Sequence, residues 1–382
     1  MDFSFNEQER QFAEAVRRYS RERLLPEFSR WDRGTPYPRE RVLELGALGV
    51  TGLSVPVAYG GSESSFTMAG ICGEELGRGD LSTTLFLQIG MIGGTIAAHA
   101  SEAVKRAWLP GMASCEKIVA LGLTEPGVGS DAAALVTTAK RDGDYYVVRG
   151  EKASISLAGY ADVAIVFART GGEGARGISA IMVPLDSPGV SRRVYRSAGE
   201  RLTQRGSLVF DDVRVPVENL LGKEGQGFYG VMNAFDYNRA IIALACVGAA
   251  MQSMEETIAY VKQRHTFGKP LAKYEGVSFQ IAEHLTMLNA SRLLAYECLA
   301  KRDRNEPHTR EAAMCKWLGP KSAAEAIHSC IILHGWMGYD QDLPHEQRYR
   351  DVVGLQIGDG TPEIMKGIIA RETFGREFMP YR

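Results

Sequence analysis

The sequence predicts an α+β protein built from three consecutive parts, the first helical, the second β-rich and the third helical again. Three observations lead to this prediction. In residues 5–116, apolar side chains recur at three- and four-residue spacing, as they do on one face of a helix. Residues 117–221 instead hold short β-rich runs separated by turn residues, which is typical of a compact antiparallel domain. Long stretches of helical character return from Gly227 onward.

These parts give three expected domains, at residues 1–116, 117–224 and 225–382, in a chain of 382 residues. At roughly 150 residues per domain, this length allows two or three domains whose cores need no disulfide or metal for stability. The β runs expected in the middle domain are 118–124, 145–156, 162–169, 178–185 and 206–217. The helices expected in the last domain are 238–264, 277–304, 309–334 and 362 to about 377.

Composition excludes several classes of function. The chain has 44 Lys and Arg against 46 Asp and Glu, a net charge of −2, which argues against nucleic acid or an anionic membrane as a partner. The longest apolar run, residues 240–251, is well short of the ~20 residues of a membrane-spanning helix. We therefore expect no membrane span, and a cytoplasmic location because the first residues do not resemble a secretion signal.

The cysteines, histidines and glycines give no further catalytic motif. The six cysteines are scattered, so we expect them reduced and mostly buried, and the seven histidines lack metal-ligand spacing, so we expect no metal. A G-x-G-x-x-G match at 225–230 follows a polar turn rather than a strand of a βαβ unit. We interpret these glycines as a flexible connector between domains.

The loop at 121–131, Leu-Gly-Leu-Thr-Glu-Pro-Gly-Val-Gly-Ser-Asp, is more specific. It joins an apolar strand to two glycines, a proline, an acid and two hydroxyl side chains, Thr124 and Ser130. Such a loop brings backbone N–H groups close to a flat or anionic ligand, to which the hydroxyl groups can add hydrogen bonds.

This loop strongly resembles the signature of the acyl-CoA dehydrogenases, and further matches follow in that family's order. They are Phe-Asp-Asp-Val-Arg-Val-Pro at 210–216, Asn-Leu-Leu-Gly at 219–222, Phe-Asp with Arg at 235–239, Arg-His-Thr-Phe-Gly-Lys-Pro at 264–270, Tyr-Arg-Asp at 349–351 and Asp-Gly-Thr at 359–361. The resemblance covers essentially the full chain. It implies the acyl-CoA dehydrogenase fold, with an N-terminal helical domain, a middle antiparallel β-barrel-like domain and a C-terminal four-helix bundle.

The resemblance also implies FAD as cofactor, an acyl-CoA thioester as substrate, an electron-transfer flavoprotein as acceptor and a homotetramer. It assigns FAD contacts to Leu121, Leu123, Thr124, Ser156, Thr361 and Glu363. It assigns contacts with the FAD of a neighbouring subunit to Arg264, Phe267 and Gly335, and substrate contacts to Ser130, Asp236, Arg239, Gly358 and Gly360. A guanidinium at the end of a helix, as expected for Arg264, can bind a pyrophosphate with two hydrogen bonds.

The catalytic base implied by the resemblance is Asp359. Most relatives carry Tyr-Glu-Gly-Thr where this chain has Gly-Asp-Gly-Thr at 358–361, so the acid is one methylene shorter. Asn238 occupies the position from which another branch supplies its acid, and an amide cannot act as the base. Thr361 is an expected helix N-cap, with Pro362 as the first helical residue.

The small residues at 358 and 359 predict a widened acyl pocket. The resemblance then points to a branched or alicyclic acyl group, as in relatives with an aspartate base that act on cyclohexane- and cyclohexene-carboxyl-CoA. Three departures from the family pattern affect expected FAD contacts. They are Ser154 beside the flavin, Trp336 in the segment expected from a neighbouring subunit, and Glu275 at the adenine end. Two alternatives stay open, an acyl-carrier-protein thioester as substrate and a thioester-binding homologue without turnover.

Overall fold

The computed structural model describes residues 4–379, and for residues 229–233 only the backbone. The N-terminal part is helical, with a π-helical turn at Ser20–Leu24 directly after the first helix. Its α-helices are α1 (Glu7–Tyr19), α2 (Phe28–Asp32), α3 (Arg39–Ala47), α4 (Phe66–Gly79), α5 (Thr84–Gly90), α6 (Ile92–His99) and α7 (Glu102–Ala113). Asn6 begins α1 with a capping box. The Asn6 side chain accepts a hydrogen bond from the backbone N–H of Glu9, and the Glu9 side chain accepts one from the backbone N–H of Asn6.

The middle part is one sheet of eight strands. They are β1 (Val119–Gly122), β2 (Thr138–Asp142), β3 (Tyr145–Ile155), β4 (Val163–Arg169), β5 (Ile178–Pro184), β6 (Val190–Val194), β7 (Gly206–Pro216) and β8 (Leu220–Leu221). The strand order is β6-β7-β3-β2-β4-β5-β8, with β1 paired to β4. Most pairs are antiparallel, as expected, and the exceptions are β1 and β2, which each run parallel to β4.

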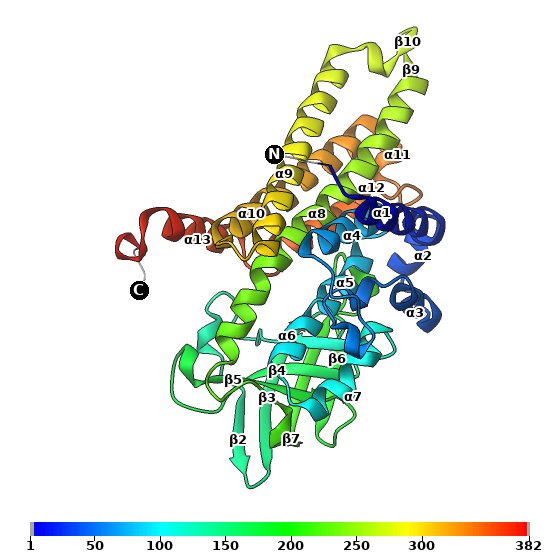
Figure 1. Ribbon diagram of the computed structural model, residues 1–382. Helices are drawn as coiled ribbons and strands as arrows, with labels where there is room; N and C mark the ends of the chain where they lie inside the picture. The colour runs from blue at the N-terminus through cyan, green and yellow to red at the C-terminus, as the bar shows by residue number, and fades with distance from the viewer. Residues whose placement is uncertain (1–3, 380–382) are drawn as a thin grey trace.

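The C-terminal part is built from long helices. They are α8 (Gly227–Gln263), α9 (Glu275–Asp303), α10 (Thr309–His334), α11 (Trp336–Tyr339), α12 (His345–Ile357) and α13 (Pro362–Phe374). Helices α8, α9, α10 and α12 pack together, and α4 of the N-terminal part packs against α8. In Figure 1, α8 and α9 extend beyond the other helices as an arm, with the small hairpin of β9 (His265–Thr266) and β10 (Lys269–Pro270) at its tip.

The glycines of the G-x-G-x-x-G match serve close packing rather than flexibility. A side chain at Gly225 would lie 2.3 Å from the carbonyl oxygen of Arg176, and one at Gly227 would lie 2.4 Å from the backbone nitrogen of Ala180 in β5. Gly227 is also the first residue of α8. The two glycines therefore let the start of α8 lie directly on the sheet, which corrects the expectation of a flexible connector.

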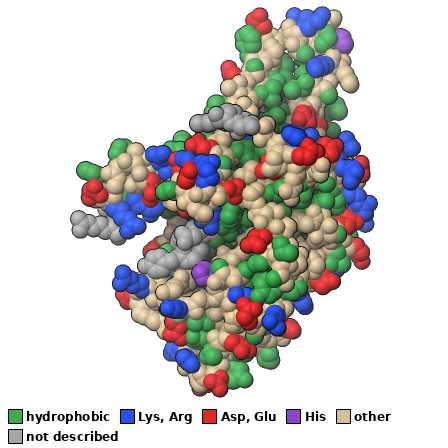
Figure 2. All heavy atoms as spheres, viewed as in Figure 1, with side chains coloured by type: hydrophobic (Ala, Val, Ile, Leu, Met, Phe, Trp, Pro, Cys, Tyr) green, Lys and Arg blue, Asp and Glu red, His purple; other side chains and the backbone are tan. Residues whose placement is uncertain are grey.

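Burial explains the apolar character of two helical stretches. Leu81–His99 and Ala234–Gln263 are apolar and long enough to cross a membrane by composition alone, but 72% of each apolar window is buried inside the protein. Core helices share this composition. On the face seen in Figure 2, positive and negative side chains are interspersed, in keeping with the net charge of −2.

All six cysteines are free and buried, as expected.

Candidate active site

A large cavity lies where the three parts of the chain meet. It encloses about 1470 Å³ and is lined by residues of α5 and α6, of the sheet, of α8, and of the loop between α12 and α13. This volume exceeds that of a pocket for one small ligand, so there is room for two ligands side by side. Of the residues predicted to bind ligands, the cavity is lined by Leu121, Leu123, Thr124, Ser130, Ser156, Arg239, Gly358, Asp359, Gly360 and Thr361.

The other predicted ligand-binding residues lie outside this cavity. Asp236 is buried and bonds Arg239 and Thr309 instead, and Glu363 is in the first turn of α13. Arg264 and Phe267 are exposed at the tip of the arm, where Phe267 has 94% of its surface accessible, and Gly335 lies between α10 and α11. Within one chain these residues do not meet the cavity, so their roles stay predictions.

The Thr124 loop, residues 123–131, is held in place by a buried ion pair between Glu125 of the loop and Lys152 of β3. The Lys152 Nζ lies 2.8 Å from Glu125 Oε1 and also donates to the Leu123 carbonyl oxygen. Glu125 accepts two more hydrogen bonds, from the backbone N–H groups of Val136 and Thr137. Burial raises the pKa of Glu125, but the hydrogen bonds from Lys152 and Thr137 outweigh it and hold that pKa below its usual value.

This ion pair shows that the acid of the Thr124 loop is structural. Glu125 is not among the residues that line the cavity, whereas Thr124, Leu121 and Leu123 line it. The Thr124 carbonyl accepts from Ala153 N–H at 2.8 Å, which ties the loop to β3. The sequence identified the loop but not the role of Lys152. The one feature that could have indicated it is the presence of a lysine within the β-rich run at 145–156.

The base loop, residues 358–361, joins α12 to α13. Asp359 has a positive φ of +56° and Gly360 one of +110°, so two successive residues adopt a conformation that L side chains disfavour. As predicted, Thr361 caps α13 and Pro362 is its first residue. Asp359 therefore lies just before the positive end of a helix, which favours a negative charge there.

Three side chains from other helices hold the base loop. Asn238 of α8 donates from Nδ2 to Asp359 Oδ2 at 2.7 Å. Arg239 donates more weakly to the Asp359 carbonyl oxygen, at 3.4 Å, and Lys316 of α10 donates to the Gly360 carbonyl oxygen at 3.1 Å. Burial lowers the pKa of Lys316 to about 8, against the opposing charge of Asp359.

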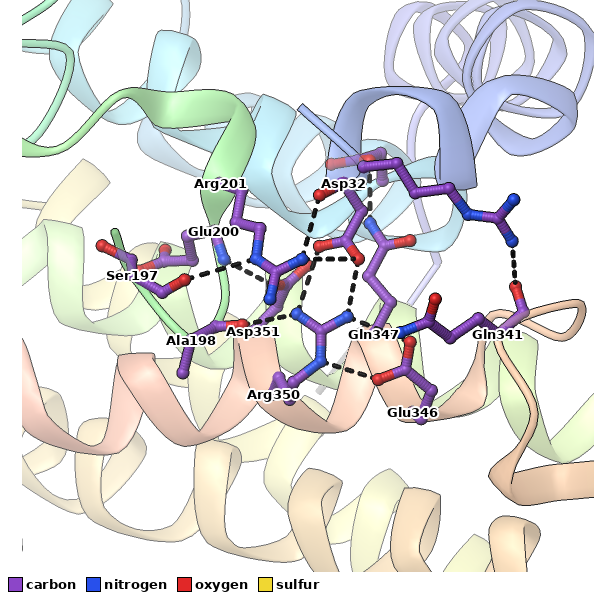
Figure 3. A network of polar contacts seen from close by, with 12 residues as sticks. Asp32, Ser197, Ala198, Glu200, Arg201, Gln341, Glu346, Gln347, Arg350 and Asp351 are labelled. Carbon is purple, nitrogen blue, oxygen red and sulfur yellow. Dashed lines mark hydrogen bonds and ion pairs between the residues drawn. The ribbon is translucent and has the colours of Figure 1, made fainter. Parts of the chain in front are cut away.

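A polar network joins the three parts of the chain (Figure 3), and three of its residues, Ala198, Glu200 and Arg350, line the cavity. Arg350 of α12 bonds Asp32 at the end of α2, Glu346 one turn earlier, and the Ala198 carbonyl oxygen of the middle part. Glu200, in the same segment of the middle part, is 3% exposed and pairs with Arg205 at 2.6 Å. Burial raises the pKa of Glu200 despite this partner.

The walls of the cavity suit a flavin. Apolar side chains of Leu121, Leu123 and Ile155 offer flat contacts for a ring system, while Thr124, Ser154 and Ser156 offer hydroxyl groups beside them. Ser154 has a positive φ of +58° at the end of β3, a strained backbone of the kind that is common at ligand sites. The residues present fit FAD: those on the sheet side would hold the ring, with the base loop on the opposite wall.

The family assignment rests on comparisons along the whole chain. Three family models match: the acyl-CoA dehydrogenase N-terminal domain at residues 6–116, the middle domain at 120–213 and the C-terminal domain at 225–374. Mitochondrial isobutyryl-CoA dehydrogenase of Dictyostelium discoideum is 36% identical over 96% of this chain and 89% of its own length. Mitochondrial short-chain specific acyl-CoA dehydrogenase of Rattus norvegicus is 34% identical over 94% of this chain and 88% of its own length.

Solved structures agree with these matches. Butyryl-CoA dehydrogenase from Megasphaera elsdenii superposes with a TM-score of 0.94 at 31% identity, and the match covers 98% of this chain and 100% of that one. The matched domains, the Thr124 loop on the sheet and the acid at the α12–α13 junction occur together in one chain. The protein belongs to the acyl-CoA dehydrogenase family of flavin-dependent oxidoreductases.

Proposed function

We propose that this enzyme removes hydrogen from the α and β carbons of an acyl-CoA thioester with a branched or alicyclic acyl group, with Asp359 as the base. FAD, when bound, supplies the acceptor of the β-hydride. Asp359 takes the α-proton, and Thr124 and Ser156 orient the ring system. Arg239, already paired with Asp236 at 2.9 Å, keeps its guanidinium at the cavity wall, where the CoA portion is expected.

The observation that carries this proposal is the free space beside an acid on the cavity wall. Oδ1 of Asp359 has no hydrogen-bond partner among the described side chains, those of residues 4–228 and 234–379, so it is available to accept a proton. A side chain at Gly358 would meet nothing nearer than the Gly354 carbonyl oxygen, 3.9 Å away. The space left by Gly358 and by the short acid would admit a branch or a ring at the α carbon.

The similarity to an isobutyryl-CoA dehydrogenase supports a branched acyl group, because isobutyryl is itself branched at the α carbon. An aspartate base reaches less far than a glutamate base, so it suits a substrate whose bulk presses the α-proton toward the acid. Both arguments favour compact, branched groups over long straight chains.

The test is flavin reduction by a series of thioesters under anaerobic conditions. We expect isobutyryl-CoA or cyclohexanecarboxyl-CoA to bleach the flavin absorbance faster than isovaleryl-CoA and much faster than octanoyl-CoA. Preference for octanoyl-CoA would refute the substrate class. Reduction by a carrier-protein thioester but not by the matching CoA ester would replace CoA with a carrier protein, and absence of reduction by every thioester would favour binding without turnover.

Asp359→Asn tests the base itself, because it keeps the shape and removes the proton acceptor. The variant should retain bound flavin while the rate of flavin reduction falls about a thousandfold or more. Reduction at a near-normal rate would assign the base to another residue. The same measurement on wild-type protein supplies the reference for both the rate and the flavin content.

We also propose a homotetramer in which the arm completes a neighbour's FAD site. At the arm and the adjoining α10–α11 turn, Phe267, Ile332 and Trp336 have 94%, 62% and 78% of their surface exposed, a large apolar area for an isolated chain. Arg264 should bind the neighbour's pyrophosphate. Arg264→Ala should lower flavin content while leaving the mass measured by light scattering unchanged, and a wild-type mass of one chain would refute the tetramer.

We also propose an electron acceptor and a cellular location for the enzyme. An electron-transfer flavoprotein is the proposed acceptor of electrons, which reoxidation of the reduced enzyme by such a protein would test. The cytoplasm is the proposed location.

A further inference from the structure

Asn238 is the side chain that directly contacts the carboxylate of the proposed base. Its Nδ2 donates to Asp359 Oδ2 at 2.7 Å, across 121 residues of sequence. Both residues line the cavity. A carboxylate only accepts hydrogen bonds, so the amide must turn its N–H toward Asp359. This fixes the orientation of the amide as well as that of the acid.

This orientation of the amide leaves its other polar atom, Asn238 Oδ1, without a hydrogen-bond partner among the side chains described. Asn238 Oδ1 is also buried. A buried acceptor without a partner destabilises the folded state, so its presence calls for an explanation. Here the explanation is the contact on the other side of the amide, where the N–H group holds the acid.

We propose that Asn238 is a positioning residue for the dehydrogenation, which holds Asp359 by Oδ2 and leaves Oδ1 as the atom that accepts the α-proton. The backbone of the base loop is held separately, by Lys316 and Arg239 on its two carbonyl oxygens. Among the described side chains, Asn238 is the one that bonds the carboxylate itself and so sets its rotation. This inference rests on the proposed function, in which Asp359 is the base.

Three charged side chains surround Asp359, and they form the background against which the loss of the Asn238 amide would change the pH–rate profile. Arg239 faces Asp359 from α8, Lys316 from α10 and Glu200 from the middle part. The amide N–H of Asn238 donates to the charged carboxylate, so we expect the acid limb of the pH–rate profile to lie at higher pH in a variant that lacks this donor.

The test compares Asn238→Leu with Gln252→Leu in flavin-loaded enzyme. Leucine keeps the branching of asparagine at Cγ, is larger, and has no donor. Gln252, on the same helix but outside the cavity, makes an equivalent bond from its amide to Glu256 at 3.0 Å. For Asn238→Leu we expect flavin reduction to slow 10- to 100-fold, a larger deuterium isotope effect at the α carbon, and less than a threefold change in substrate dissociation constant. Gln252→Leu should change none of these.

Asn238→Asp provides the second variant, since it keeps size and polarity but places an acid against Asp359. Two carboxylates at this distance share a proton, so its pH–rate profile should move further toward high pH than that of Asn238→Leu. Equal rates and pH profiles in the wild-type, Asn238→Leu and Asn238→Asp enzymes would overturn the inference. If Asp359→Asn itself still reduces flavin normally, the proposed function has failed instead, so the two failures are distinguishable.

Discussion

The Thr124 loop and the base loop, on opposite walls of the cavity, are each held by hydrogen bonds from a buried lysine. Lys152 is 0% exposed and Lys316 is 2% exposed, and burial lowers the pKa of each to about 8. Their partners differ. Lys152 bonds a carboxylate, that of Glu125, whereas the single hydrogen bond of Lys316 within residues 4–379 goes to a backbone carbonyl oxygen.

This difference separates a structural cation from one that acts on the site. The charge of Lys152 is balanced 2.8 Å away by an acid that also holds the loop, so little of its field reaches a ligand. No described acid forms an ion pair with Lys316, whose charge instead interacts with those of Asp359 and Glu200 across the site. The pair Lys152–Glu125 therefore serves the fold, and Lys316 serves the base loop.

The largest expected effect is that of Lys152→Met on stability. The substitution leaves Glu125 buried without its cation, which typically costs about 3–5 kcal/mol. Urea unfolding followed by circular dichroism measures this loss. The matched control is Lys140→Met, at an exposed position of β2, which should change stability by less than about 0.5 kcal/mol. The double variant with Glu125→Gln should recover part of the loss, and a loss below 1 kcal/mol in the single variant would contradict the structural role.

The next effect tests how the base loop holds its shape. Gly360→Ala places a side chain at φ +110°, with its Cβ only 2.4 Å from Cε of the buried Met365, so we expect a loss of about 1–3 kcal/mol. Gly358→Ala is the control in the same loop, because its φ is −60° and its surroundings are open. Equal stability of the two variants would show that the loop relaxes without strain.

Residues that act locally were predictable from sequence, and those that act across the fold were not. Helix α10 has the predicted bounds Thr309–His334, and Thr361 caps α13 as predicted, because periodicity and capping are local signals. Helix α12 was missed since its buried face carries polar side chains such as Gln347 and Asp351, which hide the apolar period. Helix α8 begins at Gly227, eleven residues before the predicted start at 238.

The candidate site divides in the same way. The Thr124 loop carries its chemistry in consecutive residues, so sequence alone identified it. The base loop depends on Asn238 and Lys316, which are 121 residues from Asp359 and 44 residues from Gly360. Only the packing of α8 and α10 against the α12–α13 junction brings these groups together, and no local pattern encodes that.

A further expected effect concerns the pH dependence of stability. The pKa of each lysine is about 8 in the folded protein against 10.5 in the unfolded chain, so between these values the unfolded state binds more protons. Stability contributed by each lysine is therefore fully present above pH 10.5 and is lost as pH falls toward 8, by up to about 1.4 kcal/mol per pH unit. Unfolding free energies of wild type and Lys316→Met from pH 7 to 10 should differ by an amount that varies above pH 8 and is constant below it. A constant difference throughout would contradict the lowered pKa of Lys316.

Lys316→Met should have the smallest effect on stability, and it tests most directly whether Lys316 differs in role from Lys152. Lys316→Met removes a buried charge together with one bond to a carbonyl, and these contributions oppose each other, so stability at pH 7 should change by less than about 1 kcal/mol. Flavin reduction should nevertheless slow several-fold, because the Gly360 carbonyl loses its tether and Asp359 loses a nearby cation. The exposed Lys321→Met on the same helix is the control for both measurements. If Lys316→Met instead lost as much stability as Lys152→Met while keeping its rate of reduction, both lysines would be structural, and the base loop would owe its position to Asn238 and its own backbone.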